Sequence, residues 1–301
     1  MVDFLPHFYF QELSNFSSHK TAVVGTVTES YRQPMANLIR SAKSANDWTV
    51  YDLLAYNIRV SSQSPDSFYG QPLPTVASLN SYLLSGTLST QGPSDEMYRL
   101  LQYLDLASRA NPGQESAIHD FAREILRALG YEKRGLLLRS RYIIPSGDPN
   151  RSAQPDICLT QGSSTILLVV QEDRITDSAC DPEPQVIAEA ITTFQCNNHT
   201  RARLGEPELD SMTIPCITMI GTRPIFYLVP VTRELSEAVA TAQYPISPTM
   251  VKRCVAAPNN RCLKGMEIPD FRQLALQRFT AFRTLAEAHW SAFMIPVNTG
   301  A

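Results

Sequence analysis

Two acidic residues stand at the ends of two apolar segments, where buried strands normally carry no charge. Asp156 opens the segment PDICLTQ, and Glu172 closes the segment TILLVVQED, directly followed by Arg174. Alternate side chains of a strand share one face, so Glu172 and Arg174 are expected to point the same way. Gly162 and two serines separate the segments, which predicts a hairpin. Such a hairpin brings Asp156 and Glu172 together at its open end.

This pair of carboxylates predicts a site for a divalent cation. Two carboxylates at the end of an apolar sheet repel each other, and burial increases that cost. A cation between them removes the penalty, and oxygen ligands suit Mg²⁺ or Mn²⁺. Such an ion activates a water molecule and polarises a phosphoryl oxygen. Asp156 and Glu172 are therefore the candidate metal ligands, and Arg174 is placed to hold a phosphate.

A third candidate acid lies on the helix predicted over residues 114–129. On a wheel of ~100° per residue, Glu115 falls about 50° from the centre of its apolar face, so it can point at the sheet. Glu124 falls on the opposite side. The next predicted helix, 181–195, carries Glu189 on its polar side, from which it can border the same site.

The elements that must position these residues follow a regular order. Periodicity and turn signals predict a helix, three strands, a helix and two strands. They are expected over 114–129, 135–145, 155–161, 165–173, 181–195, 215–221 and 225–231. This order is typical of an α/β fold built on a mixed sheet with helices on its faces.

Further elements are expected on both sides of this region. A short strand is predicted over 21–28, a helix running into a strand over 48–60, and helices over 77–86, 95–110 and 270–293. The chain therefore divides into three parts. Residues 1–110 form a mostly helical N-terminal extension of unclear role, residues 111–235 the α/β core, and residues 236–301 a C-terminal loop and long helix packing on the core.

The residues and their order resemble the PD-(D/E)XK nuclease superfamily. Its pattern is a helix bearing Glu, a strand beginning Pro-Asp, a strand ending (Asp/Glu)-x-Lys, and a further helix. Here Glu115, Pro155-Asp156 and Glu172-Asp173-Arg174 stand at those places, within residues 114–231. The resemblance implies a restriction-endonuclease-like mixed sheet flanked by helices, with helical additions at both termini.

The resemblance also implies an activity, which is Mg²⁺- or Mn²⁺-dependent hydrolysis of phosphodiester bonds in DNA or RNA. Asp156 and Glu172 would hold the ion, Glu115 would assist, and Arg174 would steady the scissile phosphate. The family's lysine is Arg174 here. Lysine can lose its proton and position the attacking water, whereas arginine stays protonated. Activity and ion binding are therefore separate expectations.

An alternative function follows from the missing lysine. The chain would be a catalytically silent protein of the same fold that binds or scaffolds partners through its terminal helices, or forms a homodimer. The acids also have purely structural interpretations: Asp156 as the start of a strand, Glu172 with Arg174 as a strand-end ion pair, and Glu115 as a favourable residue in a first helical turn. A ligand site within the first 110 residues, where Tyr98 and Tyr103 lie, is a third possibility.

Composition narrows the class of protein. The net charge of −3 and the pI near 6.0 give no electrostatic argument for a dedicated nucleic-acid binder. Neither a phosphate-binding glycine loop nor a His with Ser or Cys at a motif spacing occurs, so a triad hydrolase has no support.

No apolar run reaches the ~18 residues of a membrane span, and MVDFLPHFYFQ does not resemble a secretory signal. The six cysteines form no CxxC pair and are expected to be buried thiols of a cytoplasmic or nuclear protein.

Overall fold

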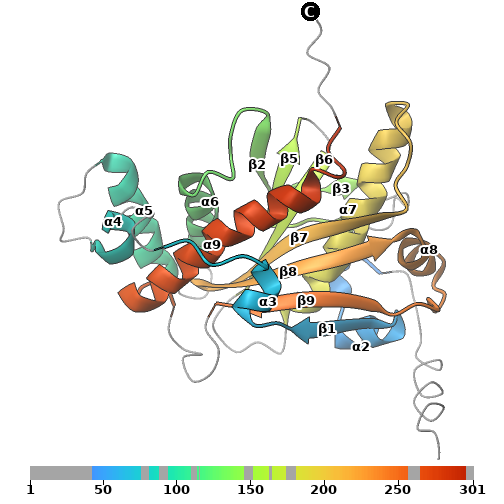
Figure 1. Cartoon of the computed structure of the whole chain (residues 1–301), viewed down its shortest axis with the longest axis horizontal. Helices are drawn as coiled ribbons and strands as arrows, with labels where there is room; N and C mark the ends of the chain where they lie inside the picture. Colours follow the sequence, from blue (N-terminus) through green and yellow to red (C-terminus); the bar gives the residue numbers. More distant parts are fainter. Residues whose placement is uncertain are drawn as a thin grey trace, which may run out of the picture.

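The computed structural model describes residues 43–75, 81–87, 94–109, 114, 116–145, 152–162, 165–173, 181–256 and 265–295. They form an α/β fold in which helices flank a seven-stranded mixed sheet (Figure 1). The expectation of a mixed sheet flanked by helices is confirmed at this level. The strand predicted over 21–28 lies outside the described residues.

The sheet has the order β1-β9-β8-β7-β6-β5-β2. Its strands are β1 (Ile58–Ser62), β2 (Leu136–Ser140), β5 (Ile157–Gln161), β6 (Thr165–Asp173), β7 (Ser211–Ile220), β8 (Arg223–Thr232) and β9 (Thr249–Val255). The pairs β1–β9 and β6–β7 are parallel, and the others are antiparallel. The sheet thus takes strands from all three predicted parts of the chain. A separate pair joins β3 (Ile144–Pro145) and β4 (Ser152–Ala153).

Helices cover both faces of the sheet. They are η1 (Ala45–Asp47), α2 (Val50–Ala55), α3 (Pro65–Tyr69), α4 (Ser81–Ser85), α5 (Asp95–Ser108), α6 (Ser116–Ala128), α7 (Pro182–Arg203), α8 (Arg233–Thr241) and α9 (Pro269–Trp290). α9 crosses one face and α7 lies on the other (Figure 1). Tyr131, just after α6, donates a hydrogen bond of 2.7 Å to the Phe279 carbonyl of α9, so α6 packs on the same side as α9. None of the described helices is long and apolar enough to cross a membrane.

Because both faces are covered, β6 is apolar at successive positions instead of alternating. Its residues from Ile166 to Val170 are at most 1% exposed. Cys158, Cys196, Cys216 and Cys254 are buried free thiols, as expected for those four positions.

Two predicted element boundaries and one predicted loop differ from the structure. The strand predicted over 135–145 breaks at Arg141, which has φ +49° and donates its backbone N–H to the Asp156 carbonyl at 2.8 Å. This left-handed residue turns the chain out of the sheet. The helix predicted over 181–195 continues to Arg203, because no helix-breaking residue occurs before Gly205, which has φ +77°. The stretch between residue 236 and the long helix also contains β9.

Candidate functional site

The structure brings Asp156 and Glu172 together. Asp156 directly precedes β5, and Glu172 is the last residue but one of β6. The antiparallel register places Ile157 opposite Val170, so both acids lie at the open end of the hairpin. Asp156 Oδ2 accepts a hydrogen bond of 2.9 Å from the backbone N–H of Glu172. The two carboxylate-bearing strand ends are therefore tied to each other.

Burial raises the pKa of both carboxyl groups. The Glu172 side chain is 9% exposed, and its pKa is raised from 4.5 to about 7, chiefly by burial. The negative charge of Asp156 acts in the same direction, and His119 opposes it. The pKa of Asp156 is also raised by burial, against the lowering effect of the hydrogen bond from Glu172. A cation at this place would be stabilised by both acids.

His119, on α6, is the site residue that the sequence analysis missed. Its Nδ1 lies 3.3 Å from Glu172 Oε1, and its Nε2 lies 2.9 Å from the Ser140 hydroxyl. Glu172 Oε1 has no aligned hydrogen bond among the described residues, so the contact with His119 is electrostatic. Glu172 raises the pKa of His119. The sequence offered only a partial signal, because His119 stands four residues after Glu115 in the helix predicted over residues 114–129.

Glu189, which was predicted on the polar side of its helix, is fully buried on α7. It is 0% exposed, and Asp181 caps the helix that carries it. Its Oε1 accepts from Gln185 Nε2 at 3.2 Å, whereas Oε2 has no partner in the described part of the chain. Burial raises the pKa of Glu189 well above its ordinary value, and the charge of Asp156 adds to this rise. Glu189 therefore borders the site from the α7 side as a fully buried acid.

Glu115 and Arg174 lie outside the described residues. Their predicted roles, as an assisting acid and as a phosphate-holding cation, stay predictions.

The donor set fits a magnesium-type ion better than a protein-enclosed metal. No group of three or more His, Cys, Asp and Glu side chains among the described residues is arranged to hold a metal. Mg²⁺, however, keeps several water ligands and usually takes only one or two carboxylates from a protein. Asp156 and Glu172 supply that number, and Glu172 Oε1 makes no hydrogen bond to a described residue, although His119 Nδ1 lies 3.3 Å from it.

Replacing His119 with glutamine is expected to raise the pKa of Glu172 above about 7. The imidazole is the side chain that lowers this pKa, and glutamine keeps hydrogen-bonding capacity without the charge. A carbon-13 titration of the glutamate carboxyl groups by NMR measures the shift. The variant His289→Gln, on α9, is the matched control and should leave Glu172 unchanged. An unchanged Glu172 in His119→Gln would show that the two side chains are uncoupled in solution.

Comparison of the chain with protein-family models finds no match, and comparison with curated proteins finds none. The assignment of a function therefore rests on the geometry of Asp156, Glu172, His119 and Glu189.

Proposed function

We propose that the protein is a metal-dependent phosphodiesterase that acts on DNA or RNA. The observation that carries this proposal is the meeting of Asp156 and Glu172 at the ends of two adjacent strands, where burial raises the pKa of both carboxyl groups. A protein gains little stability by holding two acids in a poorly solvated place. A divalent cation bound by both carboxylates would compensate this cost.

The order of the elements supports the resemblance to the PD-(D/E)XK superfamily. α6, β2, β5, β6, α7 and β7 occur in this order along the chain, with the short strands β3 and β4 between β2 and β5. β2, β5 and β6 pair antiparallel, and β7 returns parallel to β6 after α7. This is the helix, strands and helix order of the pattern, with Asp156 at the start of β5 and Glu172 at the end of β6. A restriction-endonuclease-like fold is thus part of the proposal.

The residues then take separate roles. Asp156 and Glu172 would hold Mg²⁺ or Mn²⁺, which supplies an activated water and polarises a phosphoryl oxygen. Glu115 would assist, and Arg174 would steady the scissile phosphate. Arg174 stays protonated, so it cannot take the proton of an attacking water. His119 is the neighbouring titratable group, and its contact with Glu172 raises its pKa.

One observation favours the silent binding protein as the second candidate. His119 places a side-chain cation beside Glu172 Oε1, at 3.3 Å. A protonated imidazole stabilises the carboxylate without any metal, and the fold would then serve partners through its terminal helices. The two candidates differ in whether the acids bind a divalent ion.

Calorimetric titration with Mn²⁺ separates the candidates. We expect the wild-type protein to bind Mn²⁺ and Asp156→Asn to bind at least about tenfold more weakly, because one of two carboxylate ligands is lost. The affinity should rise between pH 6 and pH 8, since the proton on Glu172 competes with the ion and leaves near pH 7. Asp66→Asn, at an exposed position on α3, should bind like the wild type.

Two outcomes would overturn the proposal. Absence of Mn²⁺ binding in the wild type would remove the metal site and favour the silent protein. Binding without Mn²⁺-dependent cleavage of single- and double-stranded DNA and RNA would keep the site and remove the activity. Cleavage that Asp156→Asn abolishes while its folded state persists would establish the enzyme.

A further inference from the structure

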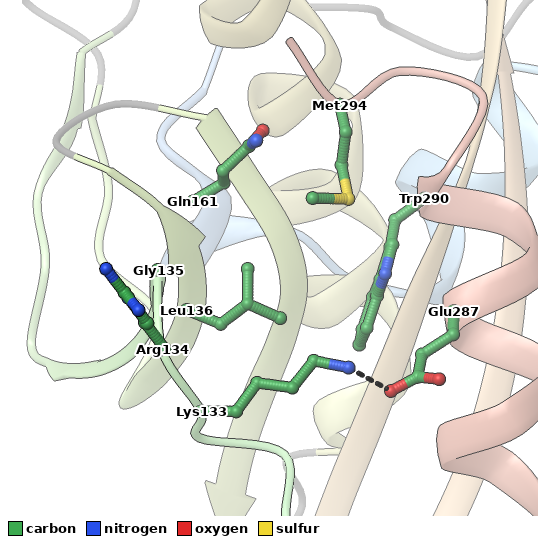
Figure 2. Close-up of a pocket in the computed structure, with 8 residues that line it drawn as sticks. All are labelled: Lys133, Arg134, Gly135, Leu136, Gln161, Glu287, Trp290 and Met294. Atoms are coloured by element: carbon green, nitrogen blue, oxygen red, sulfur yellow. Dashed lines mark hydrogen bonds and ion pairs between the residues drawn. The ribbon is translucent and has the colours of Figure 1, made fainter. Parts of the chain in front are cut away.

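A second concave site lies at the other end of the hairpin from Asp156 and Glu172. It is a cavity of about 280 Å³ between the start of β2, the end of β5 and the end of α9. Figure 2 shows the residues that line it, which are Lys133, Arg134, Gly135, Leu136, Gln161, Glu287, Trp290 and Met294. This volume is at the low end for ligand pockets, which are roughly 300–1,000 Å³, and suits a ligand of one or two rings.

The cavity has the shape of a slot with apolar walls. Trp290 and Leu136 lie on opposite sides, with Met294 closing one end (Figure 2). The segment that carries Met294 is fixed by Gln161, whose Nε2 donates to the Ile295 carbonyl at 2.7 Å and whose Oε1 accepts from its N–H at 3.1 Å. A flat ring placed in this slot would stack on the indole.

Trp290 forms one wall of the slot. Its side chain is only 3% exposed, so protein atoms hold the indole in place and leave one face toward the slot. The indole N–H makes no hydrogen bond to a described residue and is not one of the buried polar atoms without a partner. The slot therefore offers a rigid stacking surface.

The mouth of the cavity has one positive charge in excess. Lys133 Nζ lies 2.9 Å from Glu287 Oε1, so these two charges neutralise each other (Figure 2). Arg134 is exposed and has no ion pair or hydrogen bond to a described residue. Its guanidinium can hold a carboxylate with two parallel hydrogen bonds. A ligand with a single negative charge balances the site.

From this geometry we propose that the cavity binds a planar aromatic carboxylate. The ring lies between Trp290 and Leu136, and the carboxylate binds Arg134 at the mouth. The site is separate from the proposed phosphodiesterase centre and does not depend on its activity.

The indole signals of the two tryptophans give a direct test. Trp48 and Trp290 are the only tryptophans of the chain, so a proton–nitrogen-15 spectrum of the full-length protein has two indole N–H peaks, and Trp48→Phe assigns them. 2-Naphthoate is the probe, and its uncharged analogue 2-naphthamide is the control ligand. We expect the Trp290 peak to shift with a Kd of about 1 mM or tighter for the acid, while the Trp48 peak stays in place.

Two variants test the charge contact. Arg134→Ala should weaken 2-naphthoate about fivefold to tenfold and leave 2-naphthamide unchanged, because only the carboxylate uses the guanidinium. Arg59→Ala, an exposed arginine on β1 at the other edge of the sheet, should change neither ligand. A Trp290 peak that does not move at 10-fold the expected Kd, or equal binding of the acid in Arg134→Ala, would overturn the proposal.

Discussion

Replacing Asn197 with leucine is expected to lower the free energy of unfolding by about 3 kcal/mol. Asn197, on α7, is 1% exposed, and its amide forms two hydrogen bonds with the backbone of Ile166 in β6. Its Oδ1 accepts from the N–H at 2.9 Å, and its Nδ2 donates to the carbonyl at 2.8 Å. Leucine has a similar volume but leaves a buried donor and a buried acceptor unpaired. Urea denaturation measures the change.

Asn198→Leu is the matched control. Asn198 makes the same reciprocal pair with the backbone of Leu209, at 3.0 and 2.9 Å, but in a partly exposed connection where water can replace the amide. A loss of about 1 kcal/mol is expected there. If both variants lost the same free energy of unfolding, the buried contact between α7 and β6 would contribute no more to stability than the partly exposed contact of Asn198.

Glu189→Gln is expected to stabilise the protein at neutral pH. Burial raises the pKa of Glu189 well above 4.5, so the folded protein keeps a proton that the unfolded chain releases. The stability of the wild type therefore falls as the pH rises above 4.5, by about 1.4 kcal/mol per pH unit, until the folded pKa is reached. Glutamine binds no proton and lacks this dependence. The difference in favour of Glu189→Gln should be smallest at pH 4 and should grow as the pH rises, as measured by urea denaturation.

Glu234→Gln is a control whose effect on stability at neutral pH should have the opposite sign. The backbone N–H of Ser247 donates to the exposed Glu234 and lowers its pKa below 4.5. That stabilisation is present above the ordinary pKa and is lost as the pH falls, so this variant should be the less stable one at neutral pH. If Glu189→Gln were destabilising at every pH, Glu189 would be ionised and paired in the folded protein.

A gain in stability on removing Glu189 would also bear on function. Proteins keep destabilising buried acids mainly where an activity needs them. Glu189 borders Asp156, whose charge helps to raise its pKa. A stabilised Glu189→Gln variant that binds Mn²⁺ less well would connect this acid to the metal site.

The central elements were predictable because their signals are local. The apolar face of α6 has helical periodicity, and the glycine and serines between β5 and β6 mark the hairpin. The hairpin in turn placed Asp156 beside Glu172, which needed no knowledge of distant residues. The mixed sheet with flanking helices follows from the order of these elements.

What the sequence left open depends on tertiary contacts. Arginine is not a residue type that signals a left-handed backbone conformation. Only the hydrogen bond from the Arg141 N–H to the Asp156 carbonyl explains the end of β2. A helical wheel placed Glu189 on a polar side, but it could not show that the sheet covers that side too. The packing of α6 against the end of β6 places His119 at the site, and the sequence does not show this packing.

The edge of the sheet formed by β1 and β9 joins distant parts of the chain. Ser62 of β1 and Arg253 of β9 are 191 residues apart and hydrogen-bonded. Closing so long a loop costs conformational entropy, whereas the β5–β6 hairpin closes through one short turn. The hairpin therefore forms with a smaller loss of chain entropy than the β1–β9 pair. Because Asp156 and Glu172 lie on the hairpin, their relative positions depend on a local connection and not on the pairing of distant segments.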